Sequence, residues 1–202
     1  MKVRLAQFTL IASTFGFCWL GMQAVHELGH VVAAWVAGEA VHRVVLHPLV
    51  ISRTDFSRDR HPLLVIWGGP VLGVILPLFL LGVARLRRSS LLMLSQFFAG
   101  FCLVANGAYI GMGSFGGVGD AGDLARHGCP QWAKILFGLI CAPAGLWLWD
   151  GLGPCFGLKA SAGQVDRLAV RWAVGLFLGI VVLEIIGGYV GILGASEESG
   201  AR

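Results

Sequence analysis

The segment Leu5–Gly38 reads LAQFTLIASTFGFCWLGMQAVHELGHVVAAWVAG, and its only charged residue is Glu27. Near its end stands HELGH, from His26 to His30. Two helical residues that are four positions apart project from one face about 40° apart. This spacing predicts that His26 and His30 bind one zinc ion (Zn²⁺), with Glu27 beside them as general base for a metal-bound water.

The segment also has a simpler interpretation. His26 and His30 could be buried and hydrogen-bonded to Glu27 as a purely structural triad. Ionisable side chains are costly at membrane depth, however, and those that occur there generally have a function. We therefore favour the metal site.

Composition identifies the class of protein. Hydrophobic residues make up 56% of the 202 residues and charged residues 13%, and mean hydropathy is +0.78. Because soluble domains carry roughly a quarter charged residues, we expect a multi-pass integral membrane protein with one membrane-embedded domain over residues 1–202. The net charge is +4, and the basic residues lie mostly in loops. This favours contact with the lipid bilayer and predicts no nucleic-acid partner, which would need a clustered basic face.

Hydropathy predicts an all-α polytopic membrane protein with five to six transmembrane helices. An apolar helix of about twenty residues crosses a bilayer. The first segment is longer than that, so it must tilt, extend beyond the membrane, or break near Gly16 or Gly21. A break would give the sixth crossing. The expected segments are Leu5–Gly38, Leu63–Val83, Leu91–Met112, Trp132–Trp149 and Val170–Leu193.

The connector between the first two segments, AVHRVVLHPLVISRTDF at 40–56, predicts a short β-strand or hairpin interrupted at Pro48. Val41–Leu46 alternates along a strand and could pair with an extended substrate peptide. A plain surface connector is the alternative.

A third zinc ligand is expected just after the third segment. The first and third crossings run in the same direction, so residues 116–128, GGVGDAGDLARHG, lie on the membrane side of HELGH. Asp120, in a glycine-rich turn, is our first choice as the ligand, Asp123 the alternative and His127 a distant third. Either aspartate could instead cap a helix that starts nearby.

Asn106 lies inside the third segment. A buried amide there could bind a substrate carbonyl or the oxyanion of the reaction, or it could hydrogen-bond a neighbouring helix. WGGP at Trp67–Pro70 is expected to kink or locally unwind the second segment.

HELGH in the first segment, Gly68-Gly69-Pro70 in the second and a Gly-Asp element after the third resemble the site-2 protease family of intramembrane zinc metalloproteases, in its short form without a PDZ domain. The resemblance covers Phe15–Arg126, and the helices of 131–195 are additional. It implies zinc bound by His26, His30 and an aspartate that Asp120 matches by position, with Glu27 as the base. The chain departs from the best-known form, in which an Asn-Pro element precedes a Leu-Asp-Gly motif.

We therefore expect a zinc metalloendopeptidase that cleaves membrane proteins or peptides, in a bacterial cell membrane. The alternative is a non-catalytic, metal-binding scaffold that keeps the protease fold. A metal-ion transporter would need donors along several helices, and the later segments supply almost none. Basic residues divide almost evenly between the two sides, so the positive-inside rule predicts no orientation, and oligomeric state is equally open.

Overall fold

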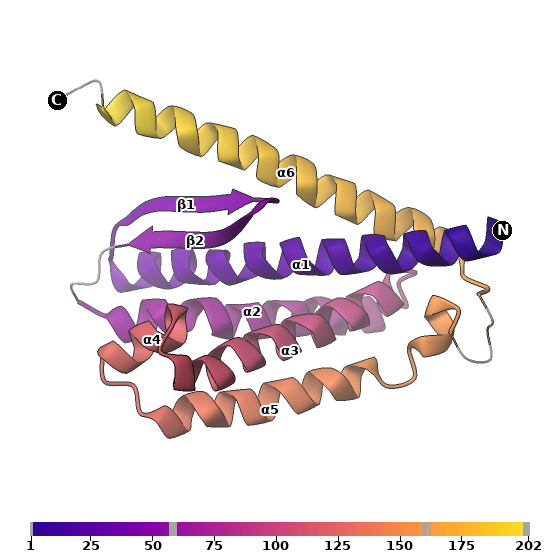
Figure 1. Ribbon diagram of the computed structural model, residues 1–202, viewed down its shortest axis with the longest axis horizontal. Helices are drawn as coiled ribbons and strands as arrows, with labels where there is room; N and C mark the ends of the chain where they lie inside the picture. The colour runs from indigo at the N-terminus through magenta and orange to yellow at the C-terminus, as the bar shows by residue number, and fades with distance from the viewer. Residues whose placement is uncertain (1, 57–59, 159–160, 162, 200–202) are drawn as a thin grey trace.

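The computed structural model describes residues 2–56, 60–158, 161 and 163–199. Long helices lie side by side, and a two-stranded sheet is placed between two of them (Figure 1). The elements in chain order are α1 (Lys2–Ala37), β1 (Val41–His47), β2 (Val50–Phe56), α2 (Pro62–Leu86), α3 (Leu92–Gly116), α4 (Gly119–Arg126), α5 (Gln131–Trp149), the 3-10 turn η1 (Gly153–Phe156) and α6 (Arg167–Ser199).

Five helices, α1, α2, α3, α5 and α6, are long and apolar enough to cross a membrane. This confirms the predicted fold class and agrees with a multi-pass membrane protein. The first segment does not break, because α1 is one helix of 36 residues. At about 1.5 Å per residue α1 is about 54 Å long and exceeds a hydrocarbon core of about 30 Å. The remaining α-helix, α4, has only 8 residues and is too short to cross a membrane.

The helices form a layered bundle in which α1 packs on α2, α3 packs on α2 and α5, and α6 packs on α1 (Figure 1). HELGH, the hairpin and α4 lie near one end of the bundle. The N-terminus and the turn between α2 and α3 lie at the other end. Because α1 and α3 run in the same direction, the residues that follow α3 return to the HELGH end.

Glycines bring α1 and α2 into direct backbone contact. A Cβ atom on Gly68 would lie 2.5 Å from the carbonyl oxygen of Gly29, and one on Gly29 would overlap the Gly68 carbonyl. Such close approach is the usual way in which membrane helices pack. The predicted unwinding at WGGP does not occur, since α2 continues through Pro70 and Pro77.

The connector forms an antiparallel hairpin, which settles the choice between one strand and two. His47 pairs with Val50 across a two-residue connection, a common hairpin length. Register shifts occur between Val41 and Arg43 and between Val45 and His47. Strand β2 lies on α1, and β1 lies beside α6 (Figure 1).

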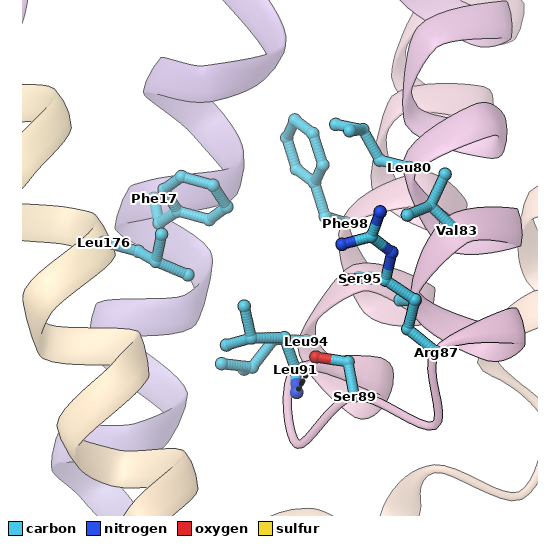
Figure 2. Close-up of a pocket in the computed structure, with 11 residues that line it drawn as sticks. Phe17, Leu80, Val83, Arg87, Ser89, Leu91, Leu94, Ser95, Phe98 and Leu176 are labelled. Atoms are coloured by element: carbon cyan, nitrogen blue, oxygen red, sulfur yellow. Dashed lines mark hydrogen bonds between the residues drawn. The ribbon is translucent and has the colours of Figure 1, made fainter.

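At the opposite end, a cleft of about 300 Å³ separates α1 and α6 from the turn that joins α2 to α3 (Figure 2).

Candidate metal centre

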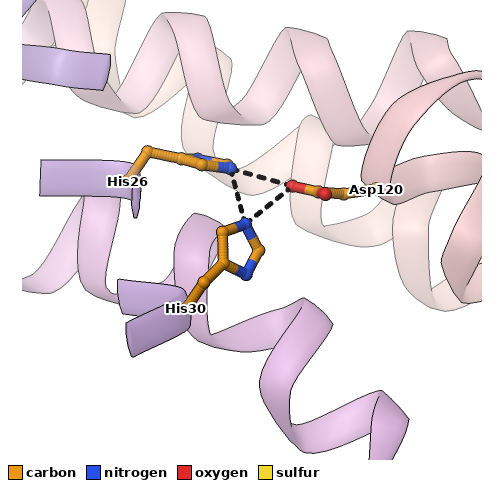
Figure 3. A group of neighbouring side chains, drawn as sticks. All are labelled: His26, His30 and Asp120. Carbon is orange, nitrogen blue, oxygen red and sulfur yellow. Dashed lines mark hydrogen bonds and ion pairs between the residues drawn. The ribbon is translucent and has the colours of Figure 1, made fainter. Parts of the chain in front are cut away.

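Three side chains converge near the HELGH end: His26 and His30 from α1, and Asp120 from α4 (Figure 3). His26 Nε2 lies 2.8 Å from Asp120 Oδ2 and 3.1 Å from His30 Nε2. His30 Nε2 lies 3.2 Å from the same carboxylate oxygen. Both histidines are buried, and the Asp120 side chain is 19% exposed, so the cluster opens to its surroundings on the Asp120 side.

The other nitrogen of each ring has its own partner. His26 Nδ1 lies 2.7 Å from Asn106 Oδ1, and His30 Nδ1 lies 2.8 Å from the carbonyl oxygen of Val65. Asn106 Nδ2 donates to the carbonyl of Cys102, which fixes the orientation of the amide. Because both ring partners are acceptors, each Nδ1 must carry the proton and donate it. In a neutral imidazole each Nε2 then points a lone pair into the cluster.

Three lone-pair donors that face one another at 2.8–3.2 Å repel unless a cation or a proton lies between them. Zinc bonds of about 2.0–2.1 Å at tetrahedral angles place ligand atoms about 3.3 Å apart. Two of the observed separations, 3.1 and 3.2 Å, are close to that value, and the third, 2.8 Å, is shorter. The donor set, two imidazoles and a carboxylate, is also one that zinc uses at catalytic sites. The residues present therefore fit the metal that the sequence implies.

Asp120 is held in place by its own helix and by two neighbours. Its backbone N–H donates to the Tyr109 hydroxyl at 3.0 Å, and Lys134 Nζ donates to the carbonyl of Ala121 at 3.1 Å. Burial acts to raise the pKa of Asp120, but where a proton lies between the three donors, the hydrogen bonds and positive charge of the imidazoles outweigh burial. The net effect holds the pKa of Asp120 well below its usual range, so the group stays a carboxylate.

Glu27 is 5% exposed and is turned toward the hairpin, outside the group of three donors. Its Oε1 accepts a hydrogen bond from the Ser52 hydroxyl at 2.9 Å, and its Oε2 accepts one from Thr54 at 2.7 Å. Both hydroxyls come from β2. The carboxylate thus lies between the helix that carries the imidazoles and the strand that covers it.

The two alternative ligands, Asp123 and His127, lie outside the cluster, and Asn106 adjoins it. Asp123, the alternative ligand, is buried and pairs with Arg126. His127 follows the end of α4 and is partly exposed. Neither aspartate caps the helix, since α4 begins at Gly119 and its N-cap, Val118, makes no side-chain hydrogen bond. Asn106 is 1% exposed and contacts His26; its proposed part in binding an oxyanion stays a prediction.

Sequence reasoning missed Ser52, Thr54, Tyr109 and Lys134. Tyr109 could have been found, because it lies three residues after Asn106 on the same face of α3 and its ring packs edge-on against His26. Ser52 and Thr54 alternate with Arg53 along a strand, but the pattern does not say which face meets α1. Lys134 gives no signal, since a lysine near a helix start is usually at the surface.

Comparisons of the chain with protein-family models, curated proteins and solved structures find no match. The functional interpretation therefore rests on the residues and geometry of the site.

Proposed function

We propose that this chain is an intramembrane zinc metallopeptidase that hydrolyses peptide bonds of membrane-embedded or membrane-proximal proteins. The observation that carries the proposal is the convergence of His26, His30 and Asp120 on one point, with Glu27 next in sequence. The resemblance of the motifs to short site-2 proteases supports the same reaction and a bacterial cell membrane as its location.

The metal would be held by Nε2 of His26, Nε2 of His30 and Oδ2 of Asp120. Zinc bound at such a site supplies a Lewis acid, which polarises a carbonyl and lowers the pKa of a water molecule toward neutrality. Asn106 and the Val65 carbonyl hold the two rings in the tautomer that leaves Nε2 unprotonated. Partners of this kind typically change metal affinity by about 10–100-fold.

Glu27 is the proposed general base. One of its oxygens takes a proton from the attacking water and later delivers it to the nitrogen of the leaving amine. Ser52 and Thr54 each occupy one lone pair of the carboxylate, and a second lone pair remains on each oxygen for the proton. The two hydroxyls therefore hold the base in one orientation.

The substrate must be extended at the bond that is cut, because a carbonyl in a helix is hydrogen-bonded and shielded. The hairpin offers a template for such a strand next to Glu27. Strand β1 is the candidate for pairing by β-augmentation, and because α6 lies beside β1, pairing requires α6 to move away from that strand.

The test combines metal analysis with cleavage of a single-span membrane peptide in detergent. We expect about one zinc per chain in the wild type, loss of zinc in Asp120→Ala, and retention in the matched Asp123→Ala. Glu27→Gln should keep zinc and lose cleavage. Zinc loss confined to Asp123→Ala would reverse the ligand assignment, and cleavage by Glu27→Gln at the wild-type rate would remove Glu27 as base.

A non-catalytic metal-binding scaffold is the second candidate. It is favoured by two hydrogen bonds, because each oxygen of Glu27 already accepts one from a hydroxyl of the hairpin. A scaffold predicts bound zinc in the wild type, no cleavage of any peptide in the panel, and no difference between the wild type and Glu27→Gln.

A further inference from the structure

The cleft at the end of the bundle opposite the metal centre has apolar walls. It opens between α1 and α6 on one side and the α2–α3 turn on the other, with a volume of about 300 Å³ (Figure 2). All four elements that border it contribute side chains: Phe17, Leu80, Val83, Leu94, Phe98 and Leu176. A slot of this kind, between helices that cross a membrane, has the chemistry of an acyl-chain site.

The mouth of the cleft is cationic. Arg87 follows the last residue of α2, and its guanidinium points toward Leu80 and Phe98 on the cleft wall (Figure 2). Arg85 and Arg88 stand in the same turn. Among the described residues, none of these three arginines makes an ion pair or a side-chain hydrogen bond.

Helices α1, α2 and α3 carry no acidic residue at this end of the bundle, and Glu184 of α6 makes no ion pair with these arginines within the described part of the chain. Residues 60–119, which include all of α2 and α3, contain no aspartate or glutamate, and the only acidic residue of α1 is Glu27 at the metal-centre end. A guanidinium offers five N–H donors in a planar fork that matches a phosphate. An anion from outside the chain is the natural partner for Arg87.

Two hydroxyl side chains, those of Ser89 and Ser95, also line the cleft. Ser89 Oγ accepts the backbone N–H of Leu91 at 3.1 Å, which leaves its own O–H available to donate. The lining of the cleft therefore combines a cationic side chain and two hydroxyls with apolar walls.

We propose that this cleft binds one anionic phospholipid of the bilayer. Its phosphate is bound by Arg87 and Ser89, and one acyl chain lies between Phe17 and Leu176 on one side and Leu80 and Phe98 on the other. Basic pockets between membrane helices bind anionic headgroups in this way. The site is separate from the metal centre, and its occupancy does not depend on peptidase activity.

A diffuse attraction is the competing explanation. Cations at a helix C-terminus complement the helix dipole, and any basic loop is drawn to an anionic surface. Under that explanation Arg85, Arg87 and Arg88 contribute alike. Under ours Arg87 dominates, because it alone of the three lines the cleft.

The experiment counts bound lipids by native mass spectrometry on the delipidated full chain. The lipids are dioleoylphosphatidylglycerol and dioleoylphosphatidylcholine, with glycerol 3-phosphate as a soluble competitor. The variants are Arg87→Gln, its matched control Arg85→Gln in the same turn, and Leu80→Trp, which fills the cleft without changing charge. Circular dichroism checks that each variant keeps its helices.

We expect the wild type to bind one phosphatidylglycerol about tenfold more tightly than phosphatidylcholine, and Arg87→Gln to lose that preference. Arg85→Gln should behave as wild type, and Leu80→Trp should weaken binding of both lipids. Equal losses in Arg85→Gln and Arg87→Gln would overturn the proposal, and so would normal binding by Leu80→Trp. Displacement by equimolar glycerol 3-phosphate would show a free-phosphate site instead of a lipid site.

Discussion

Gly69 leaves the space in which the two imidazole rings meet. A Cβ atom at this position would lie 2.8 Å from His26 Nε2 and would overlap the ring of His30. These atoms include Nε2 of both histidines, and a hydrogen bond at Nδ1 holds each ring in position. The rings therefore cannot shift to make room without moving away from Asp120. Gly69 is therefore part of the candidate metal centre, although it supplies no donor atom.

Gly69→Ala is expected to lower zinc affinity by about tenfold or more, because the added methyl displaces both rings. The matched control is Gly82→Ala on the same helix, where a Cβ atom meets nothing within 4 Å. Competition with a chromophoric chelator measures both affinities. Equal affinities in the two variants would show that the rings have room to move.

The convergence of the three proposed ligands could be predicted from single residues. The spacing of His26 and His30 places both on one helix face, and the direction of the crossings brings Asp120 to the same end. The role of Asn106 could not. Its contact with His26 depends on how α3 is rotated about its axis, and although Asn106 and Tyr109 mark one face of α3, the sequence does not say which helix that face meets.

At the scale of elements, β2 connects the hairpin to the proposed base. Ser52 and Thr54 face α1, whereas the side chain of Arg53 between them is 60% exposed. Gln23 Oε1 accepts the backbone N–H of Ser52 at 3.0 Å, so the strand is fastened to α1 by backbone as well as by side chains. The orientation of Glu27 thus depends on a strand distant from it in sequence.

If the hairpin positions the base, the double variant Ser52→Ala, Thr54→Val should lower kcat by about tenfold or more while zinc content stays unchanged. The control is Arg53→Ala, which alters the opposite face of the same strand. Peptide cleavage and metal analysis on the same preparations give both readouts. Faster cleavage in the double variant would mean that the hydroxyls restrain Glu27 instead of aligning it.

The strand at 41–46 could be predicted from its alternating pattern, and the hairpin from the interruption at Pro48. The sequence does not predict which residues of β2 face α1, because the two register shifts change the pairing between the strands. The ends of the helices were harder to predict than their approximate positions. The second segment was expected at Leu63–Val83, and α2 runs from Pro62 to Leu86 despite two internal prolines.

For the whole molecule, the candidate metal centre joins parts of the chain that are far apart in sequence. His26 and His30 belong to the first helix, and Asp120 follows the third crossing helix. A ligand that binds only the folded state stabilises it by mass action, by about 2.7 kcal/mol at a free concentration of 100 times Kd. The metal should therefore hold α1 and α4 together.

Chelation of zinc is expected to lower the thermal unfolding midpoint of the wild type in detergent, and re-addition of zinc to restore it. Asp120→Ala should unfold at the same temperature with or without the chelator, because it lacks a ligand. Differential scanning fluorimetry measures both. A wild-type midpoint that does not respond to chelator would show that the three residues are joined without metal.

Hydropathy predicted the five crossing helices, since the bilayer requires long apolar segments. Their neighbours could not be predicted. In lipid, apolar residues face both the bilayer and other helices, so hydrophobicity does not mark the contact face. The small residues Gly29 and Gly68 indicate close packing, but nothing in the sequence pairs one with the other.

The contact between Gly29 and Gly68 also determines which parts of this end can move. Backbone atoms of α1 and α2 touch there, so the two helices cannot slide or separate without losing the contact outright, and they form a fixed wall behind the imidazoles. A polypeptide arriving sideways through the lipid would have to approach from the other flank of α1, by displacing the hairpin and α6.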